Sequence, residues 1–488
     1  MAQKLLIVEA NEIAPRVFRK FAEVFPQSYI RRFFDHERFI ETMASDIAEA
    51  DLYPAQSWAS FNTGLPYSEH KVNWYNDKKD FGDFYWHAAA GTGHSTIIVN
   101  TLHSSPMRAF ASEGNYKVLI PDCFSAEPDT LPRDFESFQR LNLAVTQSNG
   151  RKAFLKQTLL QGVQSFAQDP RPRKWGLGMK SVADLTRITA TARSRPERLR
   201  SAQFPLLASI FLDAMRAHLP ELGVIFTNHV AAMQHRYWYA TFPSEYKEPI
   251  YPQSWVERYK DEILSAMELL DRWLGRFFEF AVSNGYIMLV TTSMGQSANP
   301  NVSAEYVHKS QFDYRLQDPK RLLTSLIGEL GDGAEIQGAM VPQYSFRFPS
   351  KALADAVAEK LKGFETTAES DISNPNTNIR GLILMVDQSD ATITISVSIL
   401  PNATDKIWIG GHVVNPEALG FVKLDVDDHH SGRHHAAGSL FVVNDRSELS
   451  ACWKERIDYL EYAPAIKSYF GIKNKASLAK ASHCQESA

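Results

Sequence analysis

The sequence predicts an α/β fold: a doubly wound central sheet with helices on both faces, plus a helical excursion and a small α+β insertion. Short apolar runs, beginning with LLIV at residues 5–8, recur along the chain and are typical of parallel strands covered on both faces. Segments with apolar residues at helical spacing separate these runs, as in doubly wound domains. The 488 residues, 44 % of them hydrophobic, can bury a sizeable core.

The same pattern places the elements in order. A strand at residues 4–8 precedes a helix at 16–25. The later core strands are predicted at 97–100, 118–120, 223–226, 286–291 and 439–443, and the longer helices at 204–217 and 254–284. The insertion is predicted to hold a strand at 345–348, a helix at 351–361, and a hairpin of 381–386 with 391–400 around Gln388, Ser389 and Asp390.

These elements divide the chain into six segments. We expect the core at 1–135, 201–300 and 416–472, a helical cap or excursion at 136–200, a lid insertion at 301–415 and a frayed tail at 473–488. The excursion is assigned to helices because it is rich in Arg, Lys, Gln and Ser and has little strand pattern.

Composition excludes several classes of function. The 52 Lys and Arg against 56 Asp and Glu give a net charge of −4, so no basic field attracts a nucleic acid duplex or an anionic lipid. The three cysteines, Cys123, Cys452 and Cys484, form no CxxC pair, and their low number fits a reducing compartment. No apolar run reaches the roughly 7–15 residues of a signal peptide or the roughly 20 of a membrane span. We therefore expect a soluble, cytoplasmic protein.

A motif follows the first predicted strand. Residues 52–72 read LYPAQSWASFNTGLPYSEHKV. This segment resembles the corresponding one in the alkaline phosphatase superfamily, especially in its phosphodiesterase and predicted phosphohydrolase branch. The resemblance is carried by Trp58, Ser60, Thr63, Gly64, Pro66 and His70. It implies an alkaline-phosphatase-like arrangement of the central sheet.

The resemblance also implies a nucleophile at a helix N-terminus, where free N–H groups and the helix dipole hold a transferring anion. The family position falls on Pro54, so Ser57 and Ser60 are the candidate catalytic hydroxyls, with helix capping as the alternative for Ser57. Lys71, which stands where the family usually has glycine, is a candidate substrate contact. So is Trp58, for which packing in the core is the alternative.

The ends of the strands supply candidate metal ligands, because doubly wound sheets bind ligands at their carboxyl edge. The first strand ends in VEANE, and the resemblance places a metal-binding Asp at Asn11. An amide is a poorer ligand than a carboxylate, so Glu9 or Glu12 could replace it. Ordinary polarity at the end of a strand is the alternative.

Two further segments resemble the motifs of the first metal site. NHVAAMQHRYW at 228–238 has His235 in the place of the family's histidine, and Ala231 in that of its aspartate. His229 could compensate for the lost aspartate, and Arg236 could hold anionic oxygens. DDHHSGRHHAAGSL at 427–440 has His434 in the ligand place. Its other candidates are Asp427 and His430 as ligands and Arg433 as an anion contact, with an exposed histidine cluster as the alternative.

The second metal site of the family is lost. VTTSMGQ at 290–296 has Ser293 and Met294 where the superfamily has a metal-binding Asp and His. The resemblance, which covers 1–125, 205–300 and 420–465, therefore implies at most one divalent ion, with zinc as the first choice.

The expected function is an atypical metal-dependent hydrolase or phosphotransferase acting on a small phosphoester or phosphodiester, with Ser57 or an ion-activated water as nucleophile. The main alternative is a catalytically inactive protein that binds a phosphorylated, sugar or nucleotide ligand. A third possibility is that the histidine-rich loop stores a metal or stabilises the fold with one.

Overall fold

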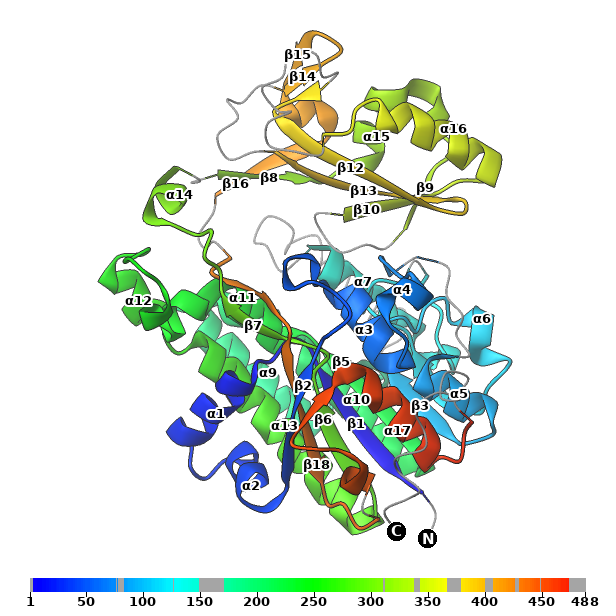
Figure 1. Ribbon diagram of the computed structural model, residues 1–488, viewed down its shortest axis with the longest axis vertical. Helices are drawn as coiled ribbons and strands as arrows, with labels where there is room; N and C mark the ends of the chain where they lie inside the picture. Colours follow the sequence, from blue (N-terminus) through cyan, green and yellow to red (C-terminus); the bar gives the residue numbers. More distant parts are fainter. Residues whose placement is uncertain are drawn as a thin grey trace.

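The computed structural model describes residues 3–75, 77, 83–125, 127–148, 171–309, 312–337, 343–366, 379–399, 407–425, 430–447 and 449–473. Its centre is a sheet with the strand order β19-β2-β18-β6-β1-β5-β3-β4 (Figure 1). The five strands from β6 to β4 run parallel, whereas β18 pairs antiparallel with both β6 and β2. The strands are β1 (Leu5–Ala10), β2 (Arg38–Met43), β3 (Thr96–Val99), β4 (Tyr116–Ile120), β5 (Leu222–Thr227), β6 (Ile287–Thr291), β18 (Ala437–Val443) and β19 (Arg456–Asp458).

Helices cover both faces of this sheet, so the predicted α/β fold class is confirmed. Strand β1 is buried along its whole length, with Leu6 and Val8 in one hydrophobic cluster and Leu5 and Ile7 in the other. This burial on both sides explains its unbroken apolar run. The first layer contains α1 (Pro15–Val24), α2 (Tyr29–His36), α7 (Glu136–Ser148), α9 (Met179–Ala192), α10 (Gln203–His218), α11 (His229–Thr241) and α13 (Glu262–Asn284). The second contains α3 (Pro54–Thr63), α5 (Tyr85–Gly91) and α17 (Tyr462–Tyr469).

Some elements differ from the prediction. The helix expected at 254–284 is two helices, α12 (Gln253–Tyr259) and α13, with Asp261 at the start of the second. Aspartate competes with helical hydrogen bonding and favours helix starts, which fits a break there. The sequence pattern also missed β2, β19 and a pair of short strands, β7 (Gly295–Ala298) and β17 (Gly432–His435), which are polar or only three to six residues long. Smaller helices are α4 (Tyr67–His70), α6 (Arg108–Ala111) and α14 (Ala304–Lys309).

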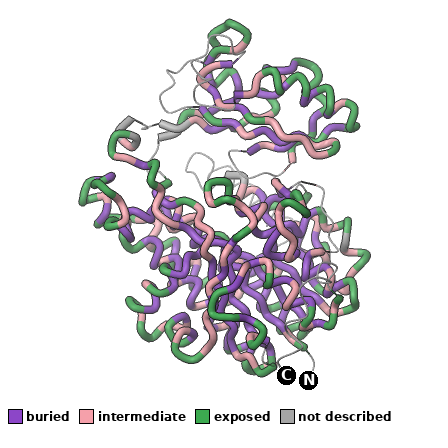
Figure 2. Tube along the Cα trace, in the orientation of Figure 1, coloured by how far each residue is buried: buried purple, intermediate pink, exposed green. Residues whose placement is uncertain are grey.

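The described residues between 312 and 425, which we call the lid, have a hydrophobic cluster of their own. Its strand pairs and sheets have the orders β12-β13-β10-β9, β11-β14-β15 and β16-β8. Figure 1 shows the lid above the carboxyl ends of the central strands, and Figure 2 shows its buried residues as a group separate from those of the core. Its elements are β8 (Phe312–Leu316), α15 (Pro319–Ile327), β9 (Glu335–Gln337), β10 (Gln343–Arg347), α16 (Lys351–Lys362), β11 (Ile379–Arg380), β12 (Leu382–Ser389), β13 (Thr392–Ile399), β14 (Ile407–Ile409), β15 (His412–Val414) and β16 (Phe421–Asp425).

The lid hairpin forms where the sequence predicts it, between β12 and β13. Asp390, in its turn, has a φ of 54°, a left-handed conformation that aspartate tolerates better than most residues. Among the helices in the described part of the chain, none has the length and apolarity required to cross a membrane.

Candidate functional site

Three ionisable side chains from distant segments meet at the carboxyl edge of the central sheet. Glu12 follows β1, His235 lies in α11 after β5, and His434 lies in β17. Glu12 Oε2 is 2.8 Å from His235 Nε2 and 3.5 Å from His434 Nε2, and the three ligand atoms lie within 4.8 Å of one another. The two imidazole rings are 5.2 Å apart. We call these three residues the cation cluster.

Glu12 reaches the cluster because the chain turns sharply after β1. Its φ of 56° is left-handed, and its carboxylate is held in place by amides. Asn11 Nδ2 donates to Glu12 Oε1 at 2.7 Å, and Gln296 Nε2 donates to Glu12 Oε2 at 2.6 Å. The sequence named Asn11 and Glu9 as first candidates at this strand end, but the carboxylate that the structure brings to the histidines is that of Glu12.

His434 is placed by the pairing of β17 with β7, in which it lies opposite Gln296. Strand β17 approaches α11 so closely that a Cβ at Gly432 would lie 2.6 Å from the backbone oxygen of Gln234. Glycine at this position therefore lets β17 lie beside His235.

Both histidines of the cluster have their Nδ1 atoms next to a backbone carbonyl. His434 Nδ1 is 2.8 Å from the oxygen of Leu52, and His235 Nδ1 is 3.3 Å from that of Gly432. A carbonyl only accepts, so Nδ1 carries a proton in both rings, and Nε2 is the nitrogen that faces Glu12 and that an ion would bind. Metal-binding histidines are held in the same way.

The charges of the cluster also suit a divalent ion. Burial disfavours an ionised Glu12, but His235 and His434 overcome this effect and lower its pKa to about 2. Burial lowers the pKa of His434, which favours the neutral, ligating imidazole. Two imidazole nitrogens and one carboxylate form a donor set that binds zinc and other first-row ions. The residues present therefore fit one such ion.

Among the described residues, the side chains in the adjacent part of the edge are neutral and are joined by hydrogen bonds. Asn11 Oδ1 accepts from Trp58 Nε1 at 2.7 Å, and Asn11 Nδ2 also donates to Asn228 Oδ1 at 2.8 Å. The hydroxyls of Ser57 and Ser293 lie 3.0 Å apart. We call these five residues the neutral network. Ser57 and Trp58 are fully buried, so the predicted nucleophile and substrate contact both lie in packed surroundings.

Two other predicted ligands lie away from the cluster. Glu9 projects into the second helical layer, where it accepts from the Tyr85 hydroxyl at 3.1 Å, and burial raises its pKa to about 8. His229 is stacked on Phe204, and its nitrogens lie 2.7 Å from Thr227 Oγ1 and 3.1 Å from the oxygen of Ala266. Burial lowers the pKa of His229 to about 3.

Ser60, the second predicted nucleophile, lies in a partly buried group with His70 and Asp46. Its Oγ donates to Asp46 Oδ2 at 2.9 Å and lies 2.8 Å from His70 Nε2. His70 Nδ1 accepts from the backbone N–H of Val72, so Nε2 carries the proton and donates to Ser60. This direction is opposite to the one that activates a serine. The contacts fix the loop after α3 rather than prepare a nucleophile.

The remaining predicted residues surround the cluster without joining it. The exposed His430 is stacked on His235 at 5.3 Å, while Arg433 lies on the opposite face of β17 from His434 and contacts Glu49 at 3.4 Å. Arg236 is buried and donates to Ala232 within α11. Lys71 is exposed and has a φ of 52°, which explains why glycine suits this position. Asp427 lies outside the described residues.

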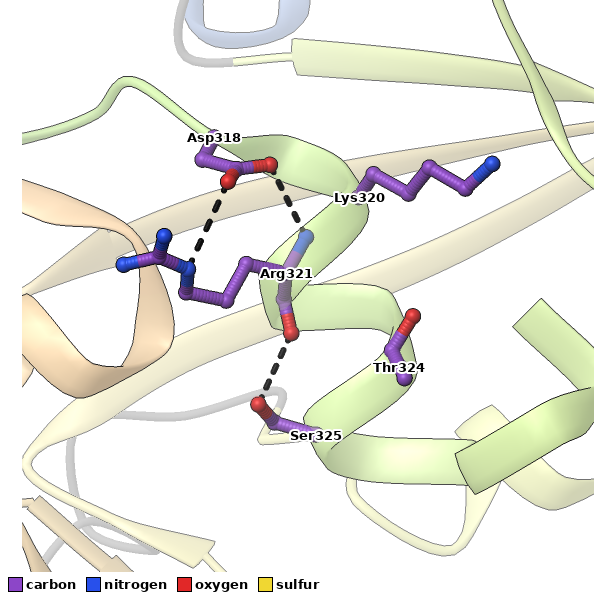
Figure 3. A pocket seen from close by; sticks show the side chains of 5 residues that line it. All are labelled: Asp318, Lys320, Arg321, Thr324 and Ser325. Carbon is purple, nitrogen blue, oxygen red and sulfur yellow. Dashed lines mark hydrogen bonds and ion pairs between the residues drawn. The ribbon is translucent and has the colours of Figure 1, made fainter. Parts of the chain in front are cut away.

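A surface pocket lies on the lid, away from this edge. It is lined by Asp318, Lys320, Arg321, Thr324 and Ser325 on the first turns of α15 (Figure 3). Asp318 caps the helix by accepting from the backbone N–H of Arg321, and it also pairs with the Arg321 guanidinium at 3.4 Å. The pocket shares no residue with the cation cluster.

The comparisons with known proteins give similarities of structure. No protein-family model and no curated protein matches the sequence. The phosphonoacetate hydrolase of Sinorhizobium meliloti 1021, solved with phosphonoformate, is 11 % identical with a TM-score of 0.38, covering 96 % of each chain. An inactive murine ectonucleotide pyrophosphatase/phosphodiesterase 5 with AMP is 11 % identical with a TM-score of 0.39, covering 97 % of this chain and 96 % of its own. Alkaline phosphatase from the Antarctic bacterium TAB5 is 10 % identical with a TM-score of 0.34, covering 96 % and 99 %. All three are members of the alkaline phosphatase superfamily, which the sequence motifs resemble.

Proposed function

We propose that the chain is a metal-dependent hydrolase or phosphotransferase that acts on a small phosphoester or phosphodiester with a single divalent ion, zinc being the first choice. The convergence of Glu12, His235 and His434 carries this proposal, because their ligand atoms lie within 4.8 Å of one another at the sheet edge. An ion held there would supply Lewis-acid stabilisation of charge on a phosphoryl oxygen.

The side chains around the ion have separate roles in this proposal. Asn11 and Gln296 fix the carboxylate of Glu12, and the carbonyls of Leu52 and Gly432 orient the two imidazoles. Glu12 is buried, whereas the side chains of His235 and His434 are 20 % and 22 % exposed, so a substrate can reach the cluster from the side of the two imidazoles.

Turnover of an aryl phosphodiester by the purified chain tests the proposal. We expect activity that a chelator removes and Zn²⁺ restores, with a loss of at least about 100-fold in His434→Gln, since even partners of metal ligands contribute roughly 10- to 100-fold. His435→Gln is the matched control, because His435 lies on the opposite face of β17 and contacts Glu49. Activity that survives both chelation and His434→Gln would contradict the proposal.

The neutral network favours a second candidate, a binding protein without turnover. Ser57 is buried and bonded to Ser293, and no base is seen beside it among the described residues. This candidate predicts Zn²⁺-dependent binding of orthophosphate, measured by calorimetry, with no release of product from the aryl phosphodiester.

A further inference from the structure

Among the described residues, three side-chain hydrogen bonds join the lid to the core next to the cation cluster, the longest of them from Asn73 Nδ2 to Asp387 Oδ2 at 3.5 Å. The Tyr53 hydroxyl donates to Gln343 Oε1 of β10 at 2.6 Å, and Trp74 Nε1 donates to Asp387 Oδ2 of β12 at 2.6 Å. The rings of Tyr53 and Trp74 contact each other edge to face, 5.6 Å apart. The bonds of Tyr53 and Trp74 therefore lie side by side and hold the same sheet of the lid.

Of these bonds, the one made by Tyr53 is linked through the neighbouring peptide unit to the cation cluster. The carbonyl that accepts from His434 Nδ1 belongs to the peptide unit between Leu52 and Tyr53. That unit is planar and rigid, so a shift of Tyr53 tilts the carbonyl that orients His434. The Tyr53 ring also contacts the His434 ring edge to face, at 6.2 Å.

We propose that Tyr53 is a positioning residue through which the docked lid holds His434 in the orientation that binds the ion. The proposal rests on the proposed function, whose cation cluster it deepens. Docking of the lid fixes the Tyr53 hydroxyl on Gln343, and the Leu52 carbonyl then keeps His434 Nε2 facing Glu12. Release of that hydroxyl frees the imidazole to rotate, and ion affinity falls.

Zn²⁺ affinity of the full chain, measured against a chromophoric chelator, tests this coupling. Tyr53→Phe and Gln343→Leu are each expected to weaken binding about 3- to 10-fold, the equivalent of one net hydrogen bond. The double variant should be no weaker than the single ones, because both changes break the same link. Asp387→Asn is the control that perturbs the other two bonds of the lid, and it should stay within about 2-fold of wild type. Unchanged affinity in both single variants, or losses that multiply in the double variant, would overturn the proposal.

A second measurement needs no metal. In the ion-free chain with ¹⁵N-labelled histidine, the NMR signals of His434, assigned through His434→Gln, should show the Nδ1–H tautomer. Tyr53→Phe should shift them toward a mixture of tautomers, and Asp387→Asn should not. Signals that Tyr53→Phe leaves unchanged would overturn the coupling. If the wild-type chain binds no Zn²⁺ but its tautomer responds to Tyr53→Phe, the proposed function fails and the coupling stands.

Discussion

The cation cluster and the neutral network occupy the same edge of one sheet, yet they differ in which side-chain atoms are already used in hydrogen bonds to neighbours. His235 and His434 each use Nδ1 on a backbone carbonyl and direct Nε2 toward Glu12. In the neutral network, the Asn11 amide uses its oxygen on Trp58 and its nitrogen on Glu12 and Asn228. A polar residue near a strand end is therefore a ligand candidate only if its neighbours leave a lone pair unused.

The largest effect is expected from removing the charge of the cation cluster. Glu12→Gln should weaken Zn²⁺ binding roughly 100- to 1000-fold, because four ligands together provide roughly 10–16 kcal/mol in structural zinc sites. Calorimetric titration of the ion-free chain measures this loss. Wild-type affinity in Glu12→Gln would mean that the carboxylate only supports the fold, and the contrast between the two regions would disappear.

The next effect concerns Glu9, which lies three residues before Glu12 but whose pKa is shifted the other way. Folded Glu9 keeps its proton up to about pH 8, whereas the unfolded chain releases it near the ordinary glutamate pKa of 4.5. The folded state therefore loses stability as pH rises through this window, by up to about 1.4 kcal/mol per unit. Between pH 5 and 7.5, the change in unfolding free energy measured in urea should differ between wild type and Glu9→Gln by roughly 3 kcal/mol, with the wild type losing more. Equal pH slopes would show that Glu9 is ionised in the fold.

The smallest effect is expected from a change in the neutral network, which should lower the stability of the fold without changing its affinity for the ion. Trp58→Phe leaves Asn11 Oδ1 without its donor in a buried site, at a cost of roughly 1–3 kcal/mol in unfolding free energy. Zn²⁺ affinity should stay within about 2-fold of wild type, because the Asn11 nitrogen still donates to Glu12. A parallel loss of stability and of ion affinity would place Asn11 in the ion site.

Much of the fold could be predicted because its central strands are continuous apolar runs. Strands β1, β5 and β6 stand out since both of their faces are covered, and the lid hairpin stands out through its alternation. Strands β7 and β17 could not be found this way. Their sequences, GQSA and GRHH, are short and largely polar, and only their pairing across the edge makes them strands.

The candidate site could be predicted in part. His235 and His434 could be named because the segments around them resemble metal-binding motifs of the alkaline phosphatase superfamily, and the structure brings their rings together. The left-handed turn at Glu12 has no signal in the sequence, so alignment by strand gives Asn11 as the ligand position and does not distinguish Glu9 from Glu12 as its substitute. The burial of His229 against Phe204 depends on a contact with α10 that spacing along the chain does not reveal.

The order of the cation cluster along the chain has a consequence for unfolding. Its members are separated by two stretches of about 200 residues, so a shared ion would act as a reversible cross-link that closes two long loops. The first strand, the middle of the core and the segment after the lid would then unfold in one cooperative step rather than one after another. Loading the ion should thus merge separate unfolding transitions into one.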